Sequence, residues 1–230
     1  MSRFAVPLLA VSVALAGCAD AVFHPAPLPT LVHPEPPVKP LTAPAFALAA
    51  GEHFTYQVRL HGIAIGKLEL EVSDAQVMSR FKTDELASAF ANVQDELVTT
   101  LDRANRRAGA STESLVINSE AQTFNADATM NGNPGQTVHT ALGLVRAWAK
   151  LDAAPGFIAL VEAGKIWRID LTRPTAEDLQ GAHAIRVDGK IRADKPIALA
   201  MWFAASDDRT PLRFELTSPD FRVVADLIRE

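Results

Sequence analysis

The chain has 230 residues, of which 48% are apolar and 21% are charged. Acidic residues outnumber Lys and Arg by 27 to 22, so the composition gives no basis for a nucleic-acid partner. Cys18 is the sole cysteine, which excludes an intramolecular disulfide. Length and composition together predict one main domain whose stability depends on its hydrophobic core.

The first residues have the pattern of an export signal. A short basic start ends at Arg3, and the run from Phe4 to Ala16 is almost purely apolar. This run is shorter than the ~20 residues of a membrane-spanning helix. It closes with a sequence that resembles the lipobox of bacterial prolipoproteins, namely Leu15, Ala16, Gly17 and Cys18. The resemblance implies a signal peptide at residues 1–17 and a Cys18 that carries diacylglycerol on its sulfur and an acyl chain, such as palmitate, on its amine.

A proline-rich segment follows the cysteine. Between Ala19 and Ala50 there are eight prolines spaced among small residues. Proline favours an extended, weakly hydrogen-bonded backbone, so residues 18–50 are predicted to be a tether between the lipidated cysteine and the domain. Ala19 after the cysteine favours the outer membrane, on its periplasmic side, although Asp20 one place later keeps inner-membrane retention open.

Alternation of apolar and polar residues marks the start of the globular part, residues 51–230. One face of the first predicted strand carries Phe54, Tyr56, Val58 and Leu60. His61 and Gly62 are expected to form a hairpin turn, and Gly66 to weaken or bulge the returning strand. Further strands are predicted at Gln76–Thr83, Ser111–Asn118, Ala121–Met130, Gly156–Val161, Lys165–Thr172, Ala182–Arg192, Pro196–Ala205, Pro211–Thr217 and Phe221–Ile228.

Two segments have helical periodicity. Apolar residues recur at helical spacing between Asp84 and Arg103, but the β-branched residues at 98–100 favour a short helix followed by a strand. A second helix is predicted after the breaker at residues 131–135. Its apolar face carries Val138, Ala141, Leu142, Val145 and Trp148, whereas His139, Arg146 and Lys150 lie elsewhere on its surface.

Three groups of residues, taken in order, resemble an exported Gram-negative family known only as domain-of-unknown-function family 3108. The opening hairpin is similar in Gly51, Glu52, Tyr56, Val58, Gly62, Ile63 and Gly66. In the middle of the chain, the resemblance lies in the helix from Val138 to Leu151, followed by Gly156 and the strand through Trp167. The closing hairpin is similar in Trp202, Asp208, Pro211, Leu212 and Arg213, although Ala204 and Ala205 stand where serine is common.

The resemblance covers nearly all of residues 51–227. It implies a mainly β fold: a strongly curved antiparallel sheet or half-open barrel, with one or two helices packed against the concave side. It implies no established activity.

The motifs of common enzyme classes are missing from the sequence. It contains no nucleophile elbow, zinc-peptidase motif, phosphate loop or dinucleotide fingerprint. The spacing of His53, His61, His139 and His183 matches no local metal motif. Asp207 and Asp208 are better explained as a hairpin turn than as a catalytic pair. The sequence therefore predicts a non-enzyme with no catalytic residue, metal site or cofactor, apart from the acyl groups on Cys18.

The leading functional hypothesis is a cell-envelope lipoprotein that binds or carries a hydrophobic or envelope-derived ligand. Its possible cavity-lining residues are Tyr56, Trp148, Trp167 and Trp202, although large aromatics at these spacings are more often core residues. The alternative is a structural or assembly lipoprotein that docks another envelope protein, and an enzyme without a familiar motif is a third interpretation. Expected partners are the membrane, through the anchor, and a lipid or envelope protein.

Overall fold

A computed structural model describes residues 39–41, 48–102, 107–127, 135–162, 165–193 and 195–228. The predicted signal peptide, Cys18 and most of the predicted tether lie outside these residues, so the lipid anchor stays a prediction. In the described part of the chain, no helix combines the length and apolarity needed to cross a membrane.

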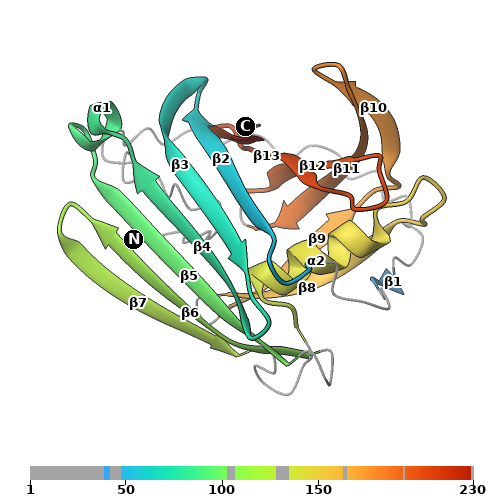
Figure 1. The fold of residues 1–230 in the computed structure, drawn as a ribbon, viewed down its shortest axis with the longest axis horizontal. Helices are drawn as coiled ribbons and strands as arrows, with labels where there is room; N and C mark the ends of the chain where they lie inside the picture. Colours follow the sequence, from blue (N-terminus) through green and yellow to red (C-terminus); the bar gives the residue numbers. More distant parts are fainter. Residues whose placement is uncertain are drawn as a thin grey trace, which may run out of the picture.

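The first half of the fold is a meander of long strands with a one-turn helix between two of them (Figure 1). Its elements are β2 (His53–Leu60), β3 (Ile63–Val72), β4 (Gln76–Thr83), α1 (Glu85–Ser88), β5 (Val93–Asp102), β6 (Arg107–Ile117) and β7 (Glu120–Asp127). Each strand pairs antiparallel with the next along the chain.

The second half begins with the longer helix and returns to the start of the meander. Its elements are α2 (Val138–Trp148), β8 (Gly156–Glu162), β9 (Lys165–Leu171), β10 (Thr175–Leu179), β11 (Ala182–Arg192), β12 (Ile197–Ala204), β13 (Pro211–Thr217) and β14 (Arg222–Leu227). Because β14 pairs with β2, the two halves form one continuous sheet. β10 pairs with β11 alone and lies off the main path.

The sheet curls without closing into a barrel. Its described path runs β1-β8-β9-β11-β12-β13-β14-β2-β3-β4-β5-β6-β7, where β1 is the short strand Lys39–Pro40. β1 pairs in parallel with the start of β8, and Gln136 bridges to Leu160 near the other end of β8. β7 forms the opposite end of the path. The prediction of a mainly β, strongly curved, half-open sheet is confirmed.

The opening hairpin shows how local sequence shapes this curvature. His61 and Gly62 both have positive φ, as a tight two-residue hairpin turn requires. The β2–β3 register then shifts between Val58 and Arg59, opposite the segment that contains Gly66. A Cβ on Gly66 would lie 2.1 Å from the Lys82 carbonyl oxygen, so only glycine allows this close approach of β3 to β4. The bulge predicted from Gly66 is therefore present.

Helix α2 lies on the concave side of the sheet. Seven of its eleven residues are buried, and its apolar side chains join a core cluster that includes Tyr56 from β2, Ile158 from β8 and Phe214 from β13. A helix that is buried on most of its surface must satisfy its polar side chains internally. The prediction that His139 and Arg146 lie away from the packed face is wrong, because both are buried, with 0% and 3% of their surface exposed.

The segment 84–103 contains a short helix followed by a strand, as expected. α1 has only four residues, and none of them is buried. The helix packed on the concave side is therefore α2 in the described structure. The sequence analysis missed β10, whose residues Thr175–Leu179 pair with β11 but are at most half-buried.

Part of the predicted tether contacts the folded domain. Lys39 and Pro40 pair with Gly156 and Phe157, and Leu41 donates a backbone hydrogen bond to the Phe157 carbonyl over 2.9 Å. Leu48 is completely buried in the main core. Residues before Gly51 therefore contribute to the packing of the described structure.

Candidate functional site

Buried polar side chains gather on the inner face of β4, β5 and β6. Strand alternation turns Ser79, Asp95, Thr99, Ser111 and Glu113 inward, where each has 7% or less of its surface exposed. His139, from the first turn of α2, lies against this face with no exposed surface. We call these six residues the polar row.

Four of the six residues of the polar row form a hydrogen-bond network. The His139 ring contacts the Thr99 hydroxyl through Nδ1 at 2.8 Å and the Ser79 hydroxyl through Nε2 at 3.1 Å. The Thr99 hydroxyl also lies 3.1 Å from that of Ser111. Burial lowers the pKa of His139 to about 3, so its ring is neutral and uses one nitrogen as donor and the other as acceptor.

A hydroxyl beside a histidine is also how a nucleophile and its general base are arranged. Here the low pKa makes His139 a poor base, because efficient general bases have pKa values near the working pH. Both ring nitrogens are already engaged by hydroxyls. The network is therefore suited to fixing α2 on β4 and β5 rather than to activating Thr99.

The remaining two residues of the polar row are carboxyl groups without partners among the described residues. Asp95 Oδ1 and both carboxyl oxygens of Glu113 are buried and have no hydrogen-bond partner among the described residues. Asp95 faces Leu115 and Glu113 faces Leu97 across the β5–β6 ladder, so the carboxyls occupy diagonal positions on neighbouring strands. Burial raises the pKa of Asp95 to about 7. Burial, and then the charge of Asp95, raises the pKa of Glu113 to about 8.

These orphaned oxygens are unusual because buried polar atoms in folded proteins almost always have a partner. Leaving a buried acceptor unsatisfied costs about 1–3 kcal/mol, and more for a charged group. A ligand that brings hydrogen-bond donors or a positive charge would remove this cost. The carboxyl pair thus has the chemistry of a binding site, and it adjoins the apolar interior of the sheet.

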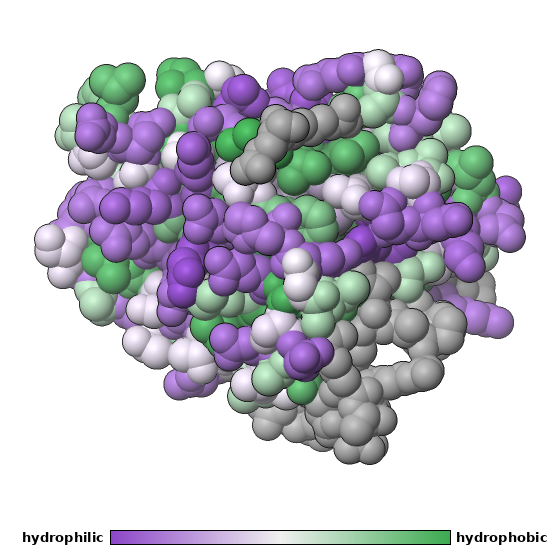
Figure 2. All heavy atoms as spheres, viewed as in Figure 1, coloured by the Kyte–Doolittle hydropathy of each residue, from purple (hydrophilic) through white to green (hydrophobic). Residues whose placement is uncertain are grey.

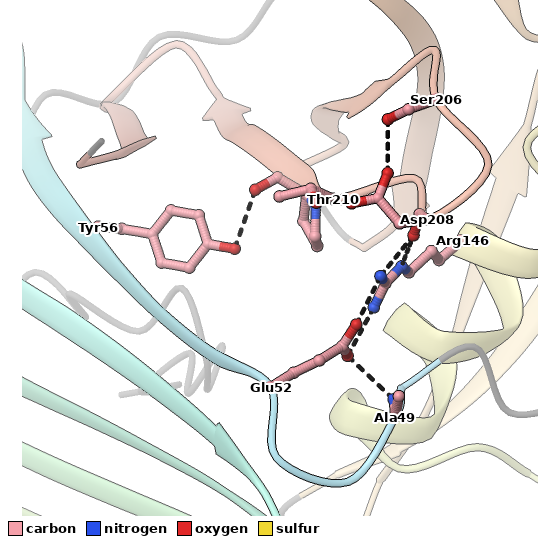
Figure 3. A network of polar contacts seen from close by, with 8 residues as sticks. Ala49, Glu52, Tyr56, Arg146, Ser206, Asp208 and Thr210 are labelled. Carbon is pink, nitrogen blue, oxygen red and sulfur yellow. Dashed lines mark hydrogen bonds and ion pairs between the residues drawn. The ribbon is translucent and has the colours of Figure 1, made fainter. Parts of the chain in front are cut away.

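A second polar cluster, built around the buried Arg146, joins α2 to two distant segments (Figure 3). Arg146 donates to both carboxylate oxygens of Glu52, over 2.8 and 2.7 Å, and also to the backbone carbonyl of Asp208. The Asp208 carboxylate in turn accepts hydrogen bonds from Ser206 and Thr210. We call this cluster the arginine clamp.

The arginine clamp is structural in character. It ties the second half of α2 to the residue that precedes β2 and to the β12–β13 turn, where Asp207 and Asp208 lie as the sequence predicted. The contacts to Ser206 and Thr210 hold the pKa of the Asp208 carboxyl below its ordinary value. Arg146 is bidentate on Glu52 and also bonds a carbonyl, so its donors are taken up by the protein itself.

The four possible cavity-lining residues are divided between the two faces of the sheet. Tyr56 is completely buried in the main core, and its hydroxyl donates to the Pro211 carbonyl over 3.1 Å. Trp148 and Trp167 pack against the same core and are half-buried. Trp202 belongs to a separate cluster on the opposite face, beneath the guanidinium groups of Arg186 and Arg213. Whether a cavity forms beside the first three residues stays a prediction.

A surface groove of about 740 Å³ lies between the end of α2 and the β10–β11 hairpin. Several of its charged side chains already have partners in the protein. Glu177 pairs with Arg186 at 3.2 Å, Asp178 accepts from the Gly181 amide, and Arg209 donates to the Ala149 carbonyl. The carboxyl pair of the polar row is therefore the stronger candidate for ligand binding.

Two features of the sequence indicate these sites. Glu113 shares its strand face with Leu115 and Ile117, and a carboxylate on the apolar face of a strand needs a partner or a function. Asp95 was hidden because its segment was assigned partly to a helix. In the described chain, no three His, Cys, Asp or Glu side chains gather as a metal site.

Comparisons with known proteins show the fold alone. No protein-family model matches the chain, and no curated protein matches it in sequence. A crystal structure from Brucella abortus, described as a beta-barrel-like protein of domain of unknown function DUF1849, is similar in fold. It is 10% identical, the match covers 84% of this chain and 98% of that one, and the TM-score is 0.56. The chain thus has the fold of an uncharacterised β-barrel-like domain.

Proposed function

We propose that this chain is a non-catalytic, lipid-anchored binding protein of the cell envelope. Its ligand is amphipathic and derived from the envelope, with a donor-bearing head group on Asp95 and Glu113 and an apolar part against the inner face of the sheet. The anchor is the acylated Cys18, and the expected location is the periplasmic side of the outer membrane. The resemblance to family 3108 remains part of this proposal.

The observation that carries the proposal is the unpartnered carboxyl pair. Three buried oxygen atoms accept no hydrogen bond from the described protein, yet they lie on the side of the sheet that the main core occupies. A ligand with both apolar and hydrogen-bonding parts fits such surroundings, because pockets for small molecules are mostly apolar with a few placed polar groups.

The polar row, as far as the structure describes it, holds no activated nucleophile, which favours binding over catalysis. Two carboxyls with raised pKa values resemble an acid–base pair. Their nearest register partners, however, are Leu97 and Leu115, and the only histidine of the polar row has a pKa of about 3. The barrel-like neighbour, which has no assigned function, is compatible with this choice.

Native mass spectrometry combined with lipid extraction tests the proposal. The full chain is purified from membranes of a bacterial host, beside the double variant Asp95→Leu and Glu113→Met, which removes the acceptors while conserving much of the volume. A matched control, Glu69→Gln with Glu71→Gln, changes two exposed carboxylates on the outer face of β3. We expect a stoichiometric bound molecule in the wild type and the control, and about tenfold lower occupancy in the double variant. Equal occupancy in all three proteins, or no bound molecule in the wild type, would overturn the proposal.

A second candidate function is docking of another envelope protein through β7. This strand ends the described sheet path, and every side chain from Glu120 to Asn125 is exposed or half-exposed. An unpaired strand edge can accept a strand from a partner. A wild type that copurifies with one protein in constant ratio, and without a bound small molecule, would favour this function.

A further inference from the structure

Three large apolar side chains protrude from one end of the sheet. Ile63, Leu86 and Phe90 have 71%, 84% and 85% of their surface exposed. They come from the start of β3, from α1 and from the residues just after α1. Figure 2 shows hydrophobic side chains at its upper left edge, over α1 and the β2–β3 turn, amid mainly hydrophilic surroundings. We call these three residues the apolar rim.

Local hydrogen bonds hold the apolar rim in this arrangement. The Asp84 amide donates to the Ile65 carbonyl over 3.0 Å, which fastens the start of α1 to the start of β3. The Asp84 carboxylate caps the helix by accepting from the Ala87 amide over 2.9 Å. Ala87 packs against the main core. Leu86 in α1 and Phe90 in the turn that follows it are both largely exposed.

The outer end of this segment is also fixed. The Asn92 amide donates to the Asn118 side chain over 2.9 Å, and the Asn118 amide donates to the Asn92 carbonyl over the same distance. These bonds join the chain after α1 to the β6–β7 turn. Leu86 and Phe90 are therefore exposed from a segment that hydrogen bonds hold at both of its ends.

The size of the apolar rim decides which partner it fits. Three side chains of this kind supply roughly 400 Å² of apolar surface, below the roughly 600 Å² that each partner of a small stable protein interface buries. Insertion of a few apolar tips into the head-group region of a bilayer needs no such continuous area. It is also the second signal that a lipid-anchored chain can add to its acyl groups.

Two lysines lie on the strands that lead to the apolar rim. Lys67 and Lys82 face each other across β3 and β4 on the outer face, one register step from Gly66 and Thr83. Neither lysine has an ion-pair partner among the described residues, whereas Arg59 and Arg80 are both paired with carboxylates. Asp84, whose carboxylate caps α1, and Glu85 are exposed acidic residues at the same end of the sheet.

We propose that the apolar rim inserts into the head-group region of a phospholipid bilayer, with Lys67 and Lys82 beside the lipid phosphates. This inference rests on the proposed location at a membrane but not on the carboxyl pair. Insertion of the rim directs this end of the sheet toward the bilayer and so determines the orientation of the domain on the membrane.

Vesicle cosedimentation tests the contribution of the rim without the acyl anchor. The mature chain from residue 18, carrying Cys18→Ala and lacking the predicted signal peptide, is mixed with vesicles of phosphatidylethanolamine and phosphatidylglycerol. Adding Leu86→Ser and Phe90→Ser is expected to lower the bound fraction about tenfold. Leu151→Ser is the matched control, because Leu151 is also exposed, at 53%, but follows α2. Equal binding of all these proteins, or no binding of the Cys18→Ala chain, would overturn the inference.

A photo-crosslinking residue at position 86 or 90 of the full chain identifies what the rim touches in cells. Phospholipid adducts at these two positions, and not at position 151, are the expected result. A crosslinked protein or a crosslinked dimer would instead assign the rim to a protein interface. Ligand occupancy measured by native mass spectrometry should be unchanged by the rim variants. This inference and the carboxyl-pair proposal can therefore be refuted independently.

Discussion

The substitution Asp95→Asn tests the energetics of the carboxyl pair. Burial raises the pKa of Asp95 from 3.8 to about 7, and the group has no described partner that stabilises its charge. Asparagine has nearly the same shape as the protonated acid but cannot ionise. The variant should therefore be more stable than the wild type, and its advantage should grow with pH.

The sign follows from proton binding. Between pH 3.8 and about pH 7 the folded state holds a proton on Asp95 that the unfolded state has lost, so stability falls as pH rises through this window. Each unit of difference between the folded and unfolded pKa corresponds to about 1.4 kcal/mol. The free energy of unfolding that the wild type loses as Asp95 ionises is therefore at most about 4 kcal/mol. The buried, neutral His139 has a lowered pKa and the opposite dependence, losing stability as pH falls below 6.5. Because His139 is present in both proteins, comparison with the variant removes its contribution.

Urea unfolding at about pH 5 and about pH 8 measures this difference. We expect the advantage of Asp95→Asn over the wild type to increase by about 2 kcal/mol between these values, after allowance for water near the site. The control Glu69→Gln, on the exposed face of β3, should stay within about 0.5 kcal/mol of the wild type. An advantage that is the same at both pH values would refute the argument that Asp95 is buried without a partner.

Two further substitutions test the frame around the site. Arg146→Ala leaves the Glu52 carboxylate without its bidentate partner and should cost about 3–5 kcal/mol in urea unfolding, whereas Arg80→Ala, which breaks an exposed pair, should cost under about 1 kcal/mol. Similar costs for both would show that the arginine clamp is not effectively buried. Gly66→Ala places a methyl group 2.1 Å from the Lys82 carbonyl and should destabilise the protein by more than about 2 kcal/mol. A change of less than about 0.5 kcal/mol would contradict the close approach of β3 and β4.

Much of the fold could be predicted because its strands alternate strictly. The hairpin over residues 53–72 has a clear apolar face, and its turn residues have the special backbone geometry that His-Gly suggested. β10 could not be found this way. Apart from Leu179, its residues are polar, charged or small, and the strand is held mainly by pairing with β11.

The candidate site was harder to predict because it depends on contacts between distant segments. His139 and Arg146 had the spacing of exposed helix residues, but their partners come from β4, β5, the residue before β2 and the β12–β13 turn. Asp95 and Glu113 become neighbours only through the β5–β6 register. A clearer signal was the composition of α2, which is apolar on nearly all sides and so requires buried partners for its polar residues.

The most direct test of the central claim is a crystal structure of the full chain purified from the membrane of a bacterial host. We predict electron density for a bound molecule on the inner face of β5 and β6, with donor atoms within hydrogen-bond distance of Asp95 Oδ1 and the Glu113 carboxyl group. Carboxyl groups that instead bond to each other or to protein side chains, with no bound molecule beside them, would contradict the proposed binding function.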